Sequence, residues 1–139
     1  MKRIIALYGH AKCGKSRTMN ILRELLRENG KSISSNPPYS GEQRETFQFN
    51  EQVVCLCPGG DDGAVVKGNF AYAASKNADI IITACRTRGE SINEVYTQEK
   101  NLNIKTEWFL KSYEYHLCQD TLELCNQEFA RVMFDALSK

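Results

Sequence analysis

The sequence lacks an excess of charge of either sign. Its 139 residues carry 18 Lys and Arg against 17 Asp and Glu, which leaves a formal net charge of +1. Proteins that bind nucleic acid or anionic membranes nonspecifically neutralise many phosphates with basic side chains, and this chain has no such surplus. Composition therefore gives no indication of a nucleic-acid or membrane partner, and we expect neither.

Long apolar runs are also missing. No stretch reaches the roughly eighteen consecutive apolar residues that a membrane-spanning helix requires. The apolar run from Ile4 to Leu7 is too short for a signal peptide, and Lys12 immediately before Cys13 argues against a lipoprotein anchor. We therefore expect a cytoplasmic protein.

Repeats and low-complexity tracts are absent as well, and 42% apolar and 25% charged residues are typical of a globular protein rather than a collagen-like or disordered one. A chain of this length ordinarily forms one core, so residues 1–139 are expected to form a single domain. Several of the six cysteines lie in apolar runs, which favours free buried thiols over a disulfide framework. Cys55 and Cys57 lack the spacing and the second ligand pair of a zinc site.

The pattern of apolar residues predicts alternating strands and helices. Short apolar runs predict strands at 3–8, 53–57, 79–85 and 104–110, with residues 46–50 as the hairpin partner of 53–57. Helical spacing predicts helices at 15–29, 61–76 and 117–137, and a further helix whose capping box is Ser91 and Glu94. The Ser- and Pro-rich segment 31–41 is expected to be a long loop.

This order predicts an α/β fold. We expect a three-layer α/β/α sandwich around a mostly parallel sheet of about five strands, with one antiparallel hairpin edge. Ligands of such sheets bind at the carboxyl ends of the strands, where Gly9, Gly59 and Arg86 fall. The inward face of the last helix is expected to contain Cys118, Leu122, Cys125, Phe129, Val132, Met133 and Ala136.

The most specific signal lies between the first strand and the first helix. Residues 9–16 are Gly-His-Ala-Lys-Cys-Gly-Lys-Ser, a full match to the Walker A pattern G-x-x-x-x-G-K-[ST]. With this motif the sequence resembles the P-loop NTPase superfamily, and the alternation of strands and helices agrees with that resemblance along the whole chain. The resemblance implies the P-loop NTPase fold and binding of a nucleoside triphosphate.

The residue types of the motif suit phosphate binding. Gly9 and Gly14 allow the backbone to turn and to approach a phosphate without a β-carbon in the way. Amides of the loop then meet the anion at the positive end of the following helix. The resemblance implies that Lys15 contacts the β and γ phosphates and that Ser16 ligates a Mg²⁺ ion that bridges them.

The remaining positions in and next to the motif are assigned to the same nucleotide site. His10, Ala11, Lys12 and Cys13 fill its variable positions. Lys12 offers a further phosphate contact, and Cys13 beside a helix N-terminus offers a reactive thiol, the alternative being that both are tolerated loop residues. Arg17 contacts the α phosphate through its backbone amide or faces solvent.

The second motif of the superfamily, the Walker B strand, ends in an Asp that holds the metal through water, but here Cys57 occupies that position. The stretch that begins at Cys57 resembles a D-x-x-G loop with its Asp replaced, which implies that Gly60 senses a γ phosphate through its amide. Asp61 or Asp62 is then the candidate metal-binding carboxylate, or else both cap a helix. Weak metal positioning would slow hydrolysis before it weakened binding.

Arg86 and Arg88 follow the strand at 79–85, near the phosphate end of the sheet. Small kinases clamp the transferred phosphate with arginines after a comparable strand, so both are candidate catalytic residues, with a solvated turn as the alternative. The N-K-x-D signature of guanine nucleotides is missing after Leu110, so ATP is expected over GTP.

Three functions stay open. The first is a magnesium-dependent ATPase with slow or partner-stimulated hydrolysis, which allows for a protein partner and has Lys15, Asp61, Arg86 and Arg88 as candidate catalytic residues. The second is a small nucleotide or metabolite kinase that uses ATP as phosphoryl donor. The third is a noncatalytic nucleotide-responsive interaction module, which the missing Walker B Asp favours.

Overall fold

The computed structural model of the chain describes residues 1–9, 13–35, 43–111 and 119–139. Within these ranges lie six strands and four helices. The strands are β1 (Arg3–Tyr8), β2 (Lys31–Ser35), β3 (Glu45–Phe49), β4 (Gln52–Cys57), β5 (Ile80–Cys85) and β6 (Thr106–Leu110). The helices are α1 (Lys15–Asn29), α2 (Gly63–Ser75), α3 (Glu90–Leu102) and α4 (Gln119–Leu137).

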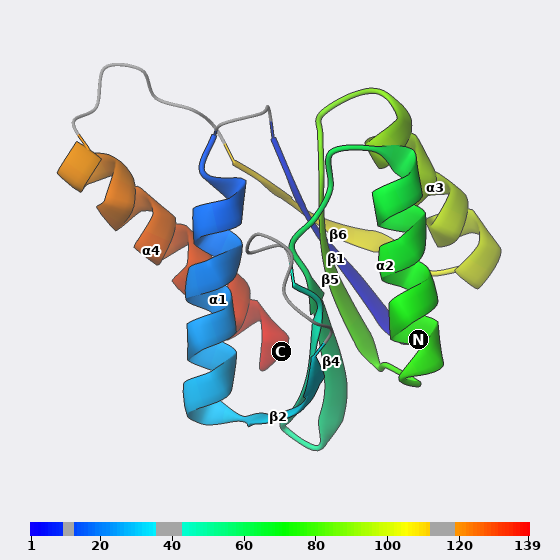
Figure 1. The fold of residues 1–139 in the computed structure, drawn as a ribbon, viewed down its shortest axis with the longest axis horizontal. Helices are drawn as coiled ribbons and strands as arrows, with labels where there is room; N and C mark the ends of the chain where they lie inside the picture. The colour runs from blue at the N-terminus through cyan, green and yellow to red at the C-terminus, as the bar shows by residue number, and fades with distance from the viewer. Residues whose placement is uncertain (10–12, 36–42, 112–118) are drawn as a thin grey trace.

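The six strands form one mixed sheet in the order β2-β3-β4-β5-β1-β6. Helices α1 and α4 cover one face of the sheet, and α2 and α3 cover the other (Figure 1). The α/β class and the three layers expected from the sequence are therefore present.

The central strands are parallel because helices connect them. β1 pairs in parallel with both β5 and β6, and β5 pairs in parallel with β4. Residues 4–7 of β1 and all of β5 are buried, as continuous apolar runs require when helices cover both faces. Four carboxyl ends therefore meet at one edge of the sheet, where the chain enters α1, α2 and α3.

The opposite side of the sheet is antiparallel. β3 and β4 form the predicted hairpin, and its turn residues Asn50 and Glu51 both have left-handed backbones, with φ of 50° and 62°. This geometry matches the right-handed twist of the flanking strands. The segment 31–41 was expected to be a loop, but Lys31–Ser35 instead forms β2 against β3, which makes six strands rather than about five. Residues 36–42 lie outside the described ranges.

The expectation of a loop failed because β2 is a polar edge strand. Its residues 31–33 are exposed, and its one large apolar side chain, Ile33, is 53% exposed. An edge strand with little buried surface shows no alternating apolar pattern, so the serines and the nearby prolines dominated the sequence signal.

Two details of the helices also differ from expectation. Ser91 is not an N-cap: α3 begins at Glu90 after Gly89, and the buried Ser91 hydroxyl accepts a hydrogen bond from the Arg86 amide at 2.9 Å.

In α4 the buried residues are Asn126, Ala130, Met133, Phe134 and Leu137. The predicted Met133 is buried and Phe129 packs against the core, but Cys125 and Val132 are exposed, and Cys118 lies outside the described residues. The buried stripe is thus turned by about one residue from the predicted one.

The cysteines are free thiols in the part of the chain that the structure describes. Cys13, Cys55, Cys57 and Cys85 are buried as predicted, whereas Cys125 is exposed. Burial raises the pKa of the Cys85 thiol to about 12. No helix within the described ranges is long and apolar enough to cross a membrane.

A buried carboxylate joins α1 to the antiparallel edge. Glu45, at the start of β3, is 1% exposed and accepts two hydrogen bonds from Arg27, at 2.7 and 3.0 Å, and one from Ser32 at 2.7 Å. Arg23 lies 3.5 Å from the same carboxylate and donates to the carbonyl of Gln43. Burial alone raises the pKa of Glu45, but the hydrogen bonds from Arg27 and Ser32 outweigh it and hold the pKa below 4.5. Glu45 is therefore a buried anion that compensates the charges of Arg23 and Arg27 of α1.

We expect Glu45→Gln to lower the free energy of unfolding by about 3 kcal/mol, because it leaves buried guanidinium charge without its anion. Because the pKa of Glu45 is lower in the folded state, its ionised carboxylate stabilises the fold fully above about pH 4.5. This stabilisation is lost as the pH falls through the folded-state pKa. The difference between wild type and variant, measured by urea unfolding, should therefore shrink in acid. Glu24→Gln is the control, since Glu24 is 62% exposed and also pairs with Arg27. Equal effects of the two variants would contradict this account.

Candidate functional site

The chain leaves β1 at Gly9, where neighbouring atoms leave no room for a side chain. The Gly9 amide donates to the carbonyl of Cys85 at 3.3 Å, and a β-carbon on Gly9 would lie 2.5 Å from the carbonyl oxygen of Lys111 and 2.7 Å from the sulfur of Cys13. The loop entrance is therefore packed between the ends of β5 and β6. Cys13 is only 3% exposed, so the thiol that was considered for redox reactivity is shielded. His10, Ala11 and Lys12 lie outside the described residues.

The N-terminus of α1 contains no anion of its own. Its N-cap, Gly14, has a left-handed backbone with φ of 94°, which favours glycine, and it provides no side-chain cap. The first turn contains no acidic residue, and both Lys15 and Arg17 lie in it. Helix N-termini have unsatisfied amides and a partial positive charge, so this end is suited to an external anion.

Lys15 folds back toward the end of β1. Its side chain is buried, with the residue 9% exposed, and its Nζ donates to the Gly9 carbonyl at 2.7 Å. The ammonium therefore lies beside the loop entrance instead of extending into solvent. Ser16 is exposed in the same turn, and the exposed Arg17 guanidinium pairs with Glu123 of α4 at 2.8 Å.

The segment after β4 packs on the end of β5. Gly60 is buried, and a β-carbon there would lie 2.2 Å from the carbonyl oxygen of Ala84. β5 lies between β4 and β1 in the sheet, so Cys57, the residue that the sequence analysis compared with the Walker B Asp, is two strands away from β1. Cys57 is fully buried, which raises the pKa of its thiol, so it is a neutral group where that motif would have a carboxylate.

A buried asparagine that the sequence analysis did not identify holds this segment. Asn69 of α2 donates to the Gly59 carbonyl at 2.7 Å and to the Thr83 hydroxyl at 3.0 Å, and its oxygen accepts from Arg44 at 2.9 Å. The residue is 1% exposed. Its signal in the sequence is a polar residue among the inward-facing apolar positions of the helix predicted at 61–76.

The two candidate carboxylates have different surroundings. Asp62 is the N-cap of α2 and accepts from the Val65 amide at 2.9 Å, which is the helix-cap role considered for it. Asp61 is exposed and lies 3.7 Å from the guanidinium of Arg86, so the fold brings these two site candidates together. Arg88 is exposed, and a β-carbon added to its neighbour Gly89 would meet no atom of the described residues within 4 Å.

Magnesium would find oxygen donors here but no ready cage. No group of three His, Cys, Asp or Glu side chains suited to a metal is present among the described residues. Of the candidate metal ligands, Ser16, Asp61 and Asp62 are all exposed, and Asp62 is already engaged as the cap of α2. Hard oxygen ligands in small number fit Mg²⁺, which usually keeps several waters and takes further oxygens from phosphates.

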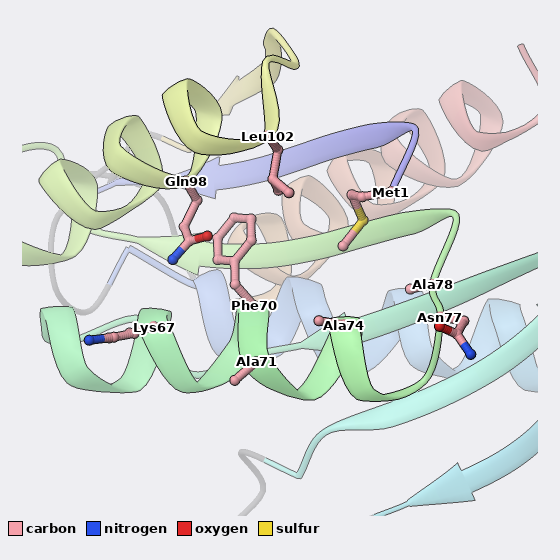
Figure 2. Close-up of a pocket in the computed structure, with 9 residues that line it drawn as sticks. All are labelled: Met1, Lys67, Phe70, Ala71, Ala74, Asn77, Ala78, Gln98 and Leu102. Carbon is pink, nitrogen blue, oxygen red and sulfur yellow. The ribbon is translucent and has the colours of Figure 1, made fainter.

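A separate hollow of about 420 Å³ lies between α2 and α3, at the amino ends of the strands. Figure 2 shows the Phe70 ring at its centre, with Met1, Gln98 and Leu102 around it. None of the predicted site residues lines this hollow, so it is distinct from the site at the carboxyl ends.

Comparison of the chain with known protein families, with curated proteins and with solved structures finds no match. The interpretation of the site therefore depends on its own geometry.

Replacement of Gly60 tests the packing of the segment after β4. Gly60→Ala places a methyl group against the backbone of β5, so we expect a loss of about 3 kcal/mol in the free energy of unfolding. Gly89→Ala is the control: its φ of 97° imposes strain, but its surroundings are open, so about 1 kcal/mol is expected. Urea unfolding compares the two. Equal losses would contradict the conclusion that the contact with β5 selects glycine at position 60.

Proposed function

We propose that this chain binds ATP with Mg²⁺ through residues 9–16 and hydrolyses it slowly or only when a partner stimulates it. The single observation that supports this best is the N-terminus of α1, which follows the carboxyl end of β1, has no acidic residue in its first turn, and lies beside the buried ammonium of Lys15. A triphosphate supplies the negative charge that the first turn of α1 lacks.

Each residue of the motif then has a chemical task. Amides at and after Gly14 donate to phosphate oxygens, and Lys15 exchanges its bond to the Gly9 carbonyl for the β and γ phosphates. The assignment of Lys15 as a catalytic residue means that it neutralises charge that grows on the β-γ bridge as water attacks the γ phosphorus. His10, Ala11, Lys12 and Cys13 complete the loop around the phosphates.

Ser16 and Asp61 are the residues that would hold Mg²⁺, and the ion would neutralise charge on the phosphate oxygens when bound. Asp61 already pairs with Arg86, and Asp62 already caps α2, so neither carboxylate is committed to a metal before nucleotide arrives. With a thiol at the position of the Walker B Asp, the site is poorly prepared for metal, which is why slow turnover is proposed.

A second candidate, a nucleotide-responsive module without turnover, is favoured by the same buried Cys57. Tight binding without phosphate release would select it. The proposal of a kinase depends on Arg86 and Arg88, and both are exposed, with Arg86 paired to Asp61. ATP is proposed over GTP because the guanine signature is missing from the sequence.

Lys15→Ala tests the phosphate site. We expect the dissociation constant for ATP to rise roughly 30-fold, because one charge-assisted contact worth about 2 kcal/mol is lost. The control is Lys67→Ala, which removes an exposed lysine from α2, beside the hollow of Figure 2. Isothermal titration calorimetry measures both. Unchanged affinity in Lys15→Ala would contradict the assignment of residues 9–16.

Substitutions of Asp61 and Asp62 should separate an effect on magnesium-dependent turnover from an effect on the stability of the fold. Asp61→Ala is expected to lower magnesium-dependent phosphate release about fivefold or more, with the metal-free affinity for ATP unchanged. Asp62→Ala is expected to lower the free energy of unfolding by about 1 kcal/mol, because it removes the cap of α2. Full turnover in Asp61→Ala would show that another group, or none, holds the ion.

A further inference from the structure

A polar side chain of α4 lies against the N-terminus of α1. Asn126 is 8% exposed and is the one polar residue among the five buried residues of α4. Its amide oxygen accepts from the hydroxyl of Thr18, which is fully buried, over 3.4 Å. An amide in an apolar helix stripe costs free energy unless polar partners compensate it, so its position calls for a physical reason.

The amide of Asn126 also fills the space beside Gly14. A β-carbon on Gly14 would lie 2.6 Å from Oδ1 of Asn126 and 3.3 Å from its Nδ2. Two constraints therefore act on Gly14: its left-handed backbone, with φ of 94°, and the amide packed against its α-carbon. The conformation of the N-cap and the position of α4 are coupled through this contact.

A second contact on the same side of α4 reaches the same turn of α1. Glu123, one turn before Asn126, pairs with the guanidinium of Arg17 at 2.8 Å. Residues three apart on a helix share a face, so Glu123 and Asn126 contact the first turn of α1 together. α4 thus holds residues 14 to 18, where the amides proposed to bind phosphate are found.

We infer that Asn126 is a positioning residue for phosphate binding, and this inference rests on the proposed function. It acts through Gly14 and Thr18: by fixing the N-cap and the first turn of α1, it keeps their amides in place for the β and γ phosphates. It does not touch the nucleotide itself. Pre-organised amides bind an anion more tightly than amides that must be ordered on binding.

The test compares the same substitution at two asparagines. Asn126→Ala removes the amide that lies against Gly14 and accepts from Thr18. Asn101→Ala is the matched control, because Asn101 is an exposed residue of α3. Calorimetric titration of each full-length variant with Mg-ATP and with inorganic tripolyphosphate measures the effect on the phosphate site alone.

We expect Asn126→Ala to raise both dissociation constants at least about fivefold, because the amides of the first turn must then be ordered on binding, and Asn101→Ala to change them less than about twofold. A role limited to stability would lower the melting temperature of Asn126→Ala while leaving the affinity of the folded protein unchanged, and that result would overturn the inference.

Thr18→Val supplies a second variant, which is nearly isosteric and removes only the hydrogen bond to Asn126. It should raise the dissociation constant for tripolyphosphate about threefold, and if Asn126→Ala fails to fold, an unchanged value in Thr18→Val overturns the inference. The results separate failure of the positioning role from failure of the proposed ATP binding. If the wild type binds Mg-ATP and the variants bind it equally well, the proposed function stands and the role of Asn126 is overturned. If the wild type binds neither Mg-ATP nor tripolyphosphate, both are overturned.

Discussion

The amides at the N-terminus of α1 need an acceptor, and the helix supplies none. Helix N-termini are usually satisfied by a capping side chain or an acidic residue in the first turn, as Asp62 does for α2. In α1 the cap is Gly14, and Lys15 and Arg17 add positive charge to the same turn. Other residues pack closely around this turn: Gly9 lies against the ends of β5 and β6, and Asn126 occupies the space beside Gly14.

Buried polar contacts hold the elements around that turn on both faces of the sheet. On the side of α1, Glu45 is the anion for Arg27 and Arg23, and this joins α1 to the start of β3. On the other side, Asn69 joins α2 to the segment after β4 and to Thr83 of β5. Each of these polar side chains has partners, which is the condition under which burial of such groups is tolerated. The fold thus keeps the carboxyl ends of β4, β5 and β1 in a fixed relation to one another.

Much of this architecture could be predicted from the sequence because its signals are local. β1 and β5 are continuous apolar runs, the turn at Asn50 and Glu51 separates two strands, and α1 has an apolar stripe that ends before Gly30. β2 could not be predicted in this way, because a polar edge strand is defined by its pairing with β3 and not by its own pattern.

The candidate site was predictable only in part, for a similar reason. The motif at residues 9–16 is contiguous, so it is visible in the sequence, whereas Asn69, Glu45 and Asn126 act on residues far from them along the chain. In α4 the predicted stripe was turned by about one residue, which put Cys125 inside and left out Asn126. An asparagine next to apolar positions at helical spacing was the available signal, but its partner Gly14 lies 112 positions away and only the fold brings the two together.

Amide chemical shifts of the ¹⁵N-labelled chain during titration with Mg-ATP test the central claim most directly, since they report which backbone donors meet the ligand. The account predicts that the largest changes occur at Gly14, Lys15, Ser16 and Arg17, with smaller changes at Gly60. Saturating shifts confined to α2 and α3, around the hollow at Phe70, or no saturating shifts at all, would contradict it.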